Sequence, residues 1–232
     1  MLKTLEGDMS LQLARRTLIT LITLPTLMIS GTASAAFVNE IHYDNTSTDA
    51  GEAIEIAGTA GTDLSGWSLV LYNGNPTQLS VYDTRSLSGI ITDQQNGYGT
   101  LSFSYPVNGI QNGNTSGTQP DGIALVDNTS SVVQFLSYEG IFTAADGAAA
   151  GLTSTDIGVA ESGTTPVGYS LQLVGTGSNY GDFSWSTEMA NSFGDVNTGQ
   201  LFVSTVPVPA AVWLLGSALF GLAGFRRKNA AI

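Results

Sequence analysis

The 232-residue sequence contains no cysteine, which excludes disulfide bonds, thiolate catalysis and cysteine-bound zinc. It contains a single histidine, His42, so a histidine-rich metal site is also excluded. Any serine–histidine–aspartate mechanism would have to use this one imidazole. No Gly-x-Ser-x-Gly nucleophile elbow accompanies it. We therefore expect His42 to have a structural or surface role.

Basic residues are scarce between residues 36 and 202. Of the seven Lys and Arg residues in the chain only Arg85 lies there, against seventeen of the nineteen Asp and Glu residues, so the net charge of this region is −16. Binding to nucleic acid requires Lys and Arg to replace the counterions of the phosphates. The composition thus argues against nucleic acid as a partner and favours solubility, divalent cations or cationic partners.

Residues 1–35 have the features of a secretory leader. Basic residues precede an apolar run at 18–29, and a small-x-small pattern that signal peptidase accepts ends at Ala35. We expect signal peptidase to cleave after Ala35 and the remainder to be exported across the inner membrane. Met1 and Met9 are both candidate start residues.

Residues 36–202 consist of short β-rich runs separated by turns that contain Gly, Asn and Pro. Alternation places Ile54 and Ile56 on one face with Glu55 opposite. It also places Phe37, Ile41 and Tyr43 together on one side of the first expected strand, interrupted by Asn39. This pattern predicts an all-β, antiparallel sandwich or barrel. The expected strands are 37–43, 52–58, 67–73, 79–83, 86–91, 98–105, 122–127, 131–138, 169–175 and 183–186.

Two segments interrupt this pattern. Residues 141–163 are rich in alanine and glycine, so they could form a short helical turn or a surface excursion. Residues 191–205 lead from the last expected strand towards the C-terminus, and we expect an extended stalk there.

The run "FVNEIHYDNTSTDAGEAIEIAGTAGTDLSGWSLVLYNG", residues 37–74, resembles the opening of lamin-tail domains from bacterial secreted proteins. Residues 120–140 and 165–185 resemble later segments of the same family. The resemblance implies an immunoglobulin-like antiparallel β-sandwich over residues 36–202. It implies no chemistry, because this fold is a scaffold on which different sites are built.

Residues 203–232 contain a second recognisable pattern, "VPVPAAVWLLGSALFGLAGFRRK". The apolar segment 210–225 would span about 24 Å as a helix, somewhat less than the hydrocarbon core of a bilayer. The basic residues after it would remain in the cytoplasm by the positive-inside rule. Prolines before it would keep the backbone extended and accessible to a protease. We expect a transient transmembrane helix.

This tail resembles the PEP-CTERM class of sorting signals, in its VPxPA variant. The resemblance implies removal by an exosortase-type enzyme after export and delivery to the cell surface or the extracellular matrix, where many carriers accompany exopolysaccharide and biofilm. The residues that carry it are Val206, Pro207, Val208, Pro209, Ala210, Arg226, Arg227 and Lys228.

Three carboxylates lie close together in the sequence "DNTSTDAGE". Asp44, Asp49 and Glu52 fall between the first two expected strands, with further side-chain and carbonyl oxygens nearby. Calcium takes six to eight oxygen ligands, which such a loop could supply, although the spacing is not that of an EF-hand. The segment therefore predicts either a calcium site or a solvated, Asx-capped turn. No other cofactor is expected.

Two further pairs of residues invite a functional interpretation. Glu40 and Glu55 could be imagined as a glycosidase pair, but their strand positions favour exposed side chains or side chains paired with backbone. Trp67 and Trp185 could stack on sugars, but their alternation with aliphatic residues favours the core. Neither pair indicates catalysis.

The sequence therefore predicts an exported, non-enzymatic surface or matrix protein with a structural or adhesive role. Its expected partners are signal peptidase, an exosortase-type enzyme, the inner membrane during transit and exopolysaccharide. A calcium- or carbohydrate-binding module is the alternative, and a secreted hydrolase is the third candidate.

Overall fold

The computed structural model describes residues 36–114 and 116–204, which lie within one compact unit of the chain. The predicted leader, the helix expected at 210–225 and the sorting residues lie outside the described residues. The described part contains no α-helix, and so none of its residues form a helix that is long and apolar enough to cross a membrane. The predicted all-β class is confirmed.

Twelve strands and one short 3-10 helix make up the described part. They are β1 (Ala36–His42), β2 (Ala53–Thr59), β3 (Ser68–Asn73), β4 (Ser80–Ser86), β5 (Tyr98–Ser104), β6 (Asp121–Val126), β7 (Val132–Tyr138), β8 (Thr155–Asp156), β9 (Tyr169–Gly177), η1 (Tyr180–Asp182), β10 (Phe183–Trp185), β11 (Met189–Ala190) and β12 (Gln200–Phe202).

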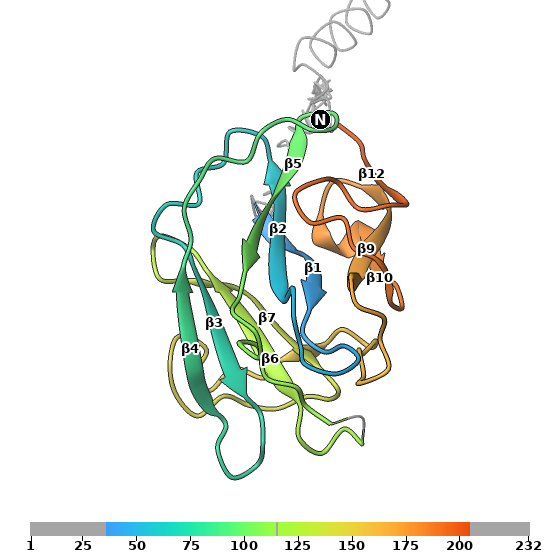
Figure 1. Ribbon diagram of the computed structural model, residues 1–232. Helices are drawn as coiled ribbons and strands as arrows, with labels where there is room; N and C mark the ends of the chain where they lie inside the picture. Colours follow the sequence, from blue (N-terminus) through green and yellow to red (C-terminus); the bar gives the residue numbers. More distant parts are fainter. Residues whose placement is uncertain (1–35, 115, 205–232) are drawn as a thin grey trace, which may run out of the picture. The chain divides into compact units, whose positions relative to one another are not determined.

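These strands form two sheets (Figure 1). The larger sheet has the order β10-β9-β1-β2-β5, and β11 and β12 also pair with β9. The smaller sheet has the order β4-β3-β6-β7-β8. Neighbouring strands are antiparallel except for β12 with β9 and β8 with β7, which are parallel.

The main hydrophobic core takes side chains from both sheets, an arrangement compatible with a β-sandwich. Ile54 and Ile56 of β2 contribute from the larger sheet, and Leu69 and Leu71 of β3 from the smaller one, as the alternation predicts. All four are completely buried. Burying one such side chain contributes about 1.5–3 kcal/mol, so the shared core is the main stabilising element of a chain without cysteines.

A β-bulge in β1 changes which side chains face that core. The register of β1 against β2 shifts between Val38 and Glu40, which leaves Asn39 as the extra residue. As a result Ile41 packs in the main core, whereas Phe37 packs in a separate aromatic cluster with Phe183 and Phe202. The prediction that Phe37 and Ile41 share a face is wrong, because strict alternation fails across the bulge.

The smaller sheet has its second face covered by the loop that follows β7. Phe142 and Ala149 of this loop are buried in a cluster with Tyr72 and Phe135, and the Tyr72 hydroxyl accepts a hydrogen bond from the Ala149 amide (2.9 Å). The alanine-rich segment is therefore a covering excursion and forms no helical turn.

The larger sheet has its second face covered by residues 191–204, which we call the C-terminal strap. Asn197, Gln200 and Phe202 of the strap are buried, and β12 pairs with β9. The stalk expected here is wrong, because these side chains fill the space beside β9 instead of extending into solvent. The strand expected at 86–91 is also wrong: Ser86 ends β4, and beyond it the segment has one isolated bridge, between Asp63 and Ile90, and no strand.

Candidate functional site

The loop between β1 and β2 holds the three predicted calcium ligands. Asp49 is almost completely buried, and both of its carboxylate oxygens accept hydrogen bonds. One oxygen accepts from the Asn45 amide (3.0 Å) and the other from the Asn112 side chain (2.9 Å). Asp49 therefore caps the turn, as the alternative interpretation expected, but in a buried rather than a solvated setting.

Glu52 is directed towards a different partner, the backbone at residues 109 and 110. Its two oxygens accept hydrogen bonds from the amides of Gly109 (2.8 Å) and Ile110 (2.9 Å). Asp44 is half-buried, and burial together with the charge of Asp49 raises its pKa to about 6. Calcium would have to displace these hydrogen bonds.

Across residues 36–114 and 116–204, no three acidic or histidine side chains are grouped to hold a metal ion. The calcium site at Asp44, Asp49 and Glu52 thus stays a prediction. A higher melting temperature in added calcium would support it, and an unchanged one would contradict it.

His42 ends β1 inside the protein, only 1% exposed, with both ring nitrogens engaged. Nδ1 contacts Glu161 Oε1 at 2.9 Å, and Nε2 lies 3.0 Å from the Asn45 side-chain amide. Burial alone would lower the pKa of His42, but the hydrogen bond and charge of Glu161 outweigh it and raise the pKa. The expected structural role for His42 agrees with this geometry.

Glu161 is the centre of this buried network. Its second oxygen accepts hydrogen bonds from the amides of Tyr43 (2.6 Å) and Asp44 (2.9 Å). Its own amide donates to the Tyr43 hydroxyl (2.8 Å), which in turn donates to Glu139 Oε1 (3.3 Å). The network therefore runs from His42 through Glu161 and Tyr43 to Glu139.

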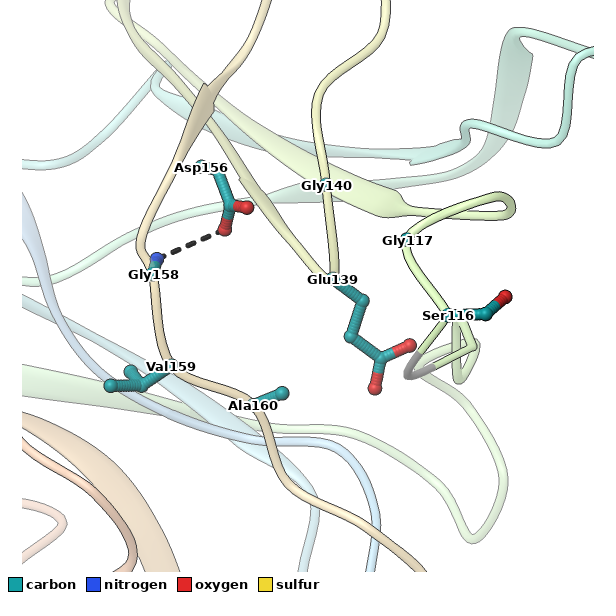
Figure 2. A pocket seen from close by; sticks show the side chains of 8 residues that line it. All are labelled: Ser116, Gly117, Glu139, Gly140, Asp156, Gly158, Val159 and Ala160. Carbon is teal, nitrogen blue, oxygen red and sulfur yellow. Dashed lines mark hydrogen bonds between the residues drawn. The ribbon is translucent and has the colours of Figure 1, made fainter.

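Glu139 carries the network to a surface pocket, the Glu139 pocket, with a volume of about 350 Å³. Figure 2 shows its side chain between two loops, with the carboxyl group directed into the space between them. Asp156 lies further along one wall and accepts a hydrogen bond from the Gly158 amide (2.9 Å). The pocket is lined by Ser116, Gly117, Glu139, Gly140, Asp156, Gly158, Val159 and Ala160.

The backbone holds Glu139 in an unusual conformation. Its φ of +64° lies in the left-handed region, which costs a non-glycine residue on the order of 1–3 kcal/mol. Gly140 follows with φ +127°, where a side chain would also press on the Gly117 carbonyl oxygen. The chain thus turns sharply after Tyr138, and this turn directs Glu139 into the pocket.

Burial raises the pKa of Glu139 to about 7, and the charges of Asp121 and Asp44 act in the same direction. Its Oε2 atom is buried and has no hydrogen-bond partner among the described residues. At a pH well below this pKa the carboxyl group is mostly protonated, so it can both donate and accept. A pocket with such a group suits a neutral, hydroxyl-rich ligand better than a charged one.

Glu40 and Glu55 lie away from this pocket and are completely buried, so of the two expected settings the exposed one is wrong and pairing with backbone amides is found, at Ser192 and Gly194. Glu40 accepts hydrogen bonds from the hydroxyls of Ser170 (2.6 Å) and Ser192 (3.0 Å). Glu55 accepts from the Asn39 side chain (3.0 Å) and the Gly194 amide (2.6 Å). Because the C-terminal strap covers them, the two carboxyl groups hold the strap to the sheet.

The two tryptophans have the expected packing role. Trp67 is 8% exposed within the main core, and Trp185 packs against the same core from β10. The Trp185 indole donates a hydrogen bond to the Tyr180 hydroxyl (3.0 Å).

Comparison of the chain with protein-family models, with curated proteins and with solved structures finds no match. The assignment of a site therefore depends on geometry. The sequence interpretation did not single out Glu139, Asp156 or Glu161. A single glutamate followed by glycine at the end of a hydrophobic strand was the one available signal for Glu139, because such a pair commonly marks a sharp turn.

Proposed function

We propose that this chain is the precursor of an exported, non-enzymatic surface or matrix protein with a structural or adhesive role. Its scaffold would be the immunoglobulin-like β-sandwich of lamin-tail domains. Signal peptidase would remove residues 1–35, and an exosortase-type enzyme would act on the C-terminal signal after transient membrane anchoring. The mature protein would then reach the cell surface or an exopolysaccharide matrix.

The internal use of the only histidine is the observation that supports this proposal. General-base activation of a hydroxyl nucleophile requires an accessible imidazole within hydrogen-bond reach. His42 instead bonds to Glu161 and Asn45 inside the protein. A secreted hydrolase that depends on histidine is therefore the weakest of the three candidate functions.

Mass spectrometry of the mature C-terminus tests the export part of the proposal. The full chain would be expressed in two matched hosts, with and without an exosortase-type enzyme. We expect the surface fraction of the first host to contain a chain that ends between Val206 and Ala210. A Pro207→Ala, Pro209→Ala double variant should keep its C-terminal residues and stay in the membrane fraction. Surface protein that still ends at Ile232 in both hosts would contradict the proposal.

A carbohydrate-binding module is the second candidate function, and the Glu139 pocket favours it. The pocket combines a carboxyl group of raised pKa with several glycine backbones that a ligand can approach closely. Binding of a matrix sugar here would be compatible with an adhesive role.

A further inference from the structure

Arg85 is the only basic residue among those that the structure describes, and its environment is unusual. It lies on β4, the outer strand of the smaller sheet, and is half-buried. The one ion pair formed within the described residues joins His42 and Glu161. The Arg85 guanidinium thus has no carboxylate partner there, although seventeen acidic residues share the domain.

The guanidinium lies over the ring of Tyr105, 5.0 Å from the ring centroid. Such a cation–π contact contributes about 0.5–1 kcal/mol at an exposed site and leaves the N–H donors at the guanidinium edge free. Tyr105 itself is 8% exposed, and its hydroxyl is buried without a hydrogen-bond partner. Leaving a buried hydroxyl unpaired costs about 1–3 kcal/mol. The edge of the guanidinium is therefore available to a ligand, whereas the buried Tyr105 hydroxyl is not.

Both residues line a groove of about 480 Å³ between β4 and the loop that follows β5. Residues 82–85 form one wall, and Tyr105, Pro106 and Gly109 form the other. The groove combines a cation, two tyrosine rings, a proline ring and the oxygens of Asp83 and Thr84. It shares no residue with the Glu139 pocket.

A charged residue on an outer strand can simply prevent another chain from pairing with that strand. In that role the side chain is extended and its charge lies in solvent. Arg85 is instead folded onto an aromatic ring, a position that prepares the guanidinium for a planar anion. Arginine recognises carboxylates through two parallel hydrogen bonds.

We propose that this groove binds a carboxylate-bearing sugar, a hexuronate unit of an acidic polysaccharide. Arg85 binds the carboxylate, Asp83 and Thr84 accept or donate hydrogen bonds at the sugar hydroxyls, and the rings of Tyr82 and Pro106 contact the apolar face of the sugar. The assignment depends on neither export nor the Glu139 pocket. It can fail while the proposed function stands, and the reverse also holds.

Calorimetric titration of the full chain with a defined hexuronate oligosaccharide tests the assignment. The titration is done near 0.15 M salt, where charges more than about 8 Å apart are largely screened and the acidity of the domain no longer repels the ligand. We expect saturable binding. Arg85→Ala should weaken it at least about tenfold, because hydrogen bonds to charged groups are the stronger ones. Arg85→Lys should restore only part of it, since lysine cannot bind a carboxylate bidentately.

Tyr105→Leu should weaken binding, because it removes the ring that positions Arg85, whereas Tyr169→Leu, at an exposed tyrosine outside the groove, should not. A neutral oligosaccharide of equal length controls for other sugar sites, and its affinity should be the same in Arg85→Ala. Thermal melting confirms that each variant is folded. The assignment would be overturned if the parent protein did not bind the hexuronate oligosaccharide. It would also be overturned if Arg85→Ala bound it with unchanged affinity. Equal affinity for an oligoglutamate peptide would overturn the sugar class.

Discussion

At the scale of single residues, most polar groups of this domain satisfy one another. The His42 imidazole, the Glu161 carboxylate and both oxygens of Glu52 bond to other groups of the protein. Glu139 differs, because one of its oxygens is unpartnered and its backbone is held in the left-handed region. Raised pKa values and backbone strain gather at functional sites more often than elsewhere. Glu139 is therefore the residue whose substitution is most informative.

Binding at the Glu139 pocket should depend on the protonation of this one group. We expect that any neutral glycan which binds there loses affinity severalfold as the pH rises from 6 to 8, because ionisation near pH 7 removes the donor. Glu139→Gln keeps a donor and an acceptor at every pH, so its affinity should stay constant over this range. A glycan array followed by calorimetry measures both.

Glu188→Gln serves as the control, because Glu188 lies outside the pocket and accepts a hydrogen bond from Thr165. The affinity of the Glu188→Gln variant for the glycan should equal that of the parent protein at each pH. A glycan whose binding is equally pH-dependent in parent and Glu139→Gln would show that Glu139 does not contact it.

At the scale of elements, the C-terminal strap is part of the fold rather than a connection out of it. Three consecutive amide side chains of the β4–β5 loop hold it from one side. Gln94 donates to the Gly194 carbonyl (2.7 Å), Gln95 accepts from the Phe202 amide, and Asn96 donates to the Phe202 carbonyl (2.7 Å). Glu40 and Glu55 hold it from the sheet side. The strap thus completes the second face of the larger sheet.

Phe202→Ala should therefore destabilise the whole domain by about 3–5 kcal/mol, the usual cost of removing a buried phenylalanine. The Phe202 ring is completely buried and stacks on Tyr98 at 5.0 Å between centroids. Urea unfolding measures the change. Leu201→Ala is the matched control: this neighbouring side chain is 45% exposed, so its removal should change stability by less than about 0.5 kcal/mol. Equal effects of the two substitutions would mean that the strap is not packed as described.

At the scale of the whole molecule, the described carboxyl groups far outnumber the cations that could stabilise their charged forms. Burial raises the pKa of Glu55 to about 8 and that of Asp121 to about 6. Together with Glu139 and Asp44, these groups bind more protons in the folded than in the unfolded protein between about pH 4.5 and 8. His42 acts in the same direction, because its pKa is also raised.

Stability should consequently fall as the pH rises. A carboxyl group whose pKa is higher in the folded than in the unfolded protein makes its full contribution to stability at pH values below the unfolded pKa. That contribution is lost as the pH rises through the folded pKa. For Glu55 that window extends from 4.5 to about 8. We expect a higher melting temperature near pH 5.5 than near pH 8.5, measured by thermal unfolding monitored by circular dichroism.

Glu55→Gln should make this decline shallower. The variant should melt lower than the parent at pH 5.5, because its amide N–H group would face donors at Asn39 or Gly194. The difference in melting temperature between the variant and the parent should become smaller as the pH rises. Asp195→Asn, an exposed position in the same strap, should reproduce the parent's slope. A melting temperature that rises steadily from pH 5.5 to 8.5 would contradict the raised pKa values.

Local pattern was sufficient to predict the all-β class and most of the strands. Alternation located β2, β3 and β5 correctly, because one face of each is apolar and packs in the shared core. It could not show that the opposite faces are also buried, since those faces are covered by segments distant in the sequence. For this reason the sequence left Glu55 either exposed or paired with backbone: its backbone partner, Gly194, is 139 residues away.

The candidate site was less predictable than the fold. His42 was recognised, but its partner Glu161 lies 119 residues further along the chain in a segment that has no strand pattern. The bulge at Asn39 changed the face of Phe37 through a single extra residue. Arg85 was noticed only for its charge. Its position over Tyr105 depends on the approach of the edges of two sheets, which no local pattern encodes.

The pairing of β12 with β9 also has a mechanical consequence. β12 runs parallel to β9 and β1 runs antiparallel to it, so the chain enters β1 and leaves β12 at the same end of the larger sheet. Tension on the chain beyond Phe202 would act along the axis of β12. It would load the hydrogen bonds to β9 together, in shear, rather than opening them one by one. The strap would thus make the C-terminal end of the domain the end that resists such tension.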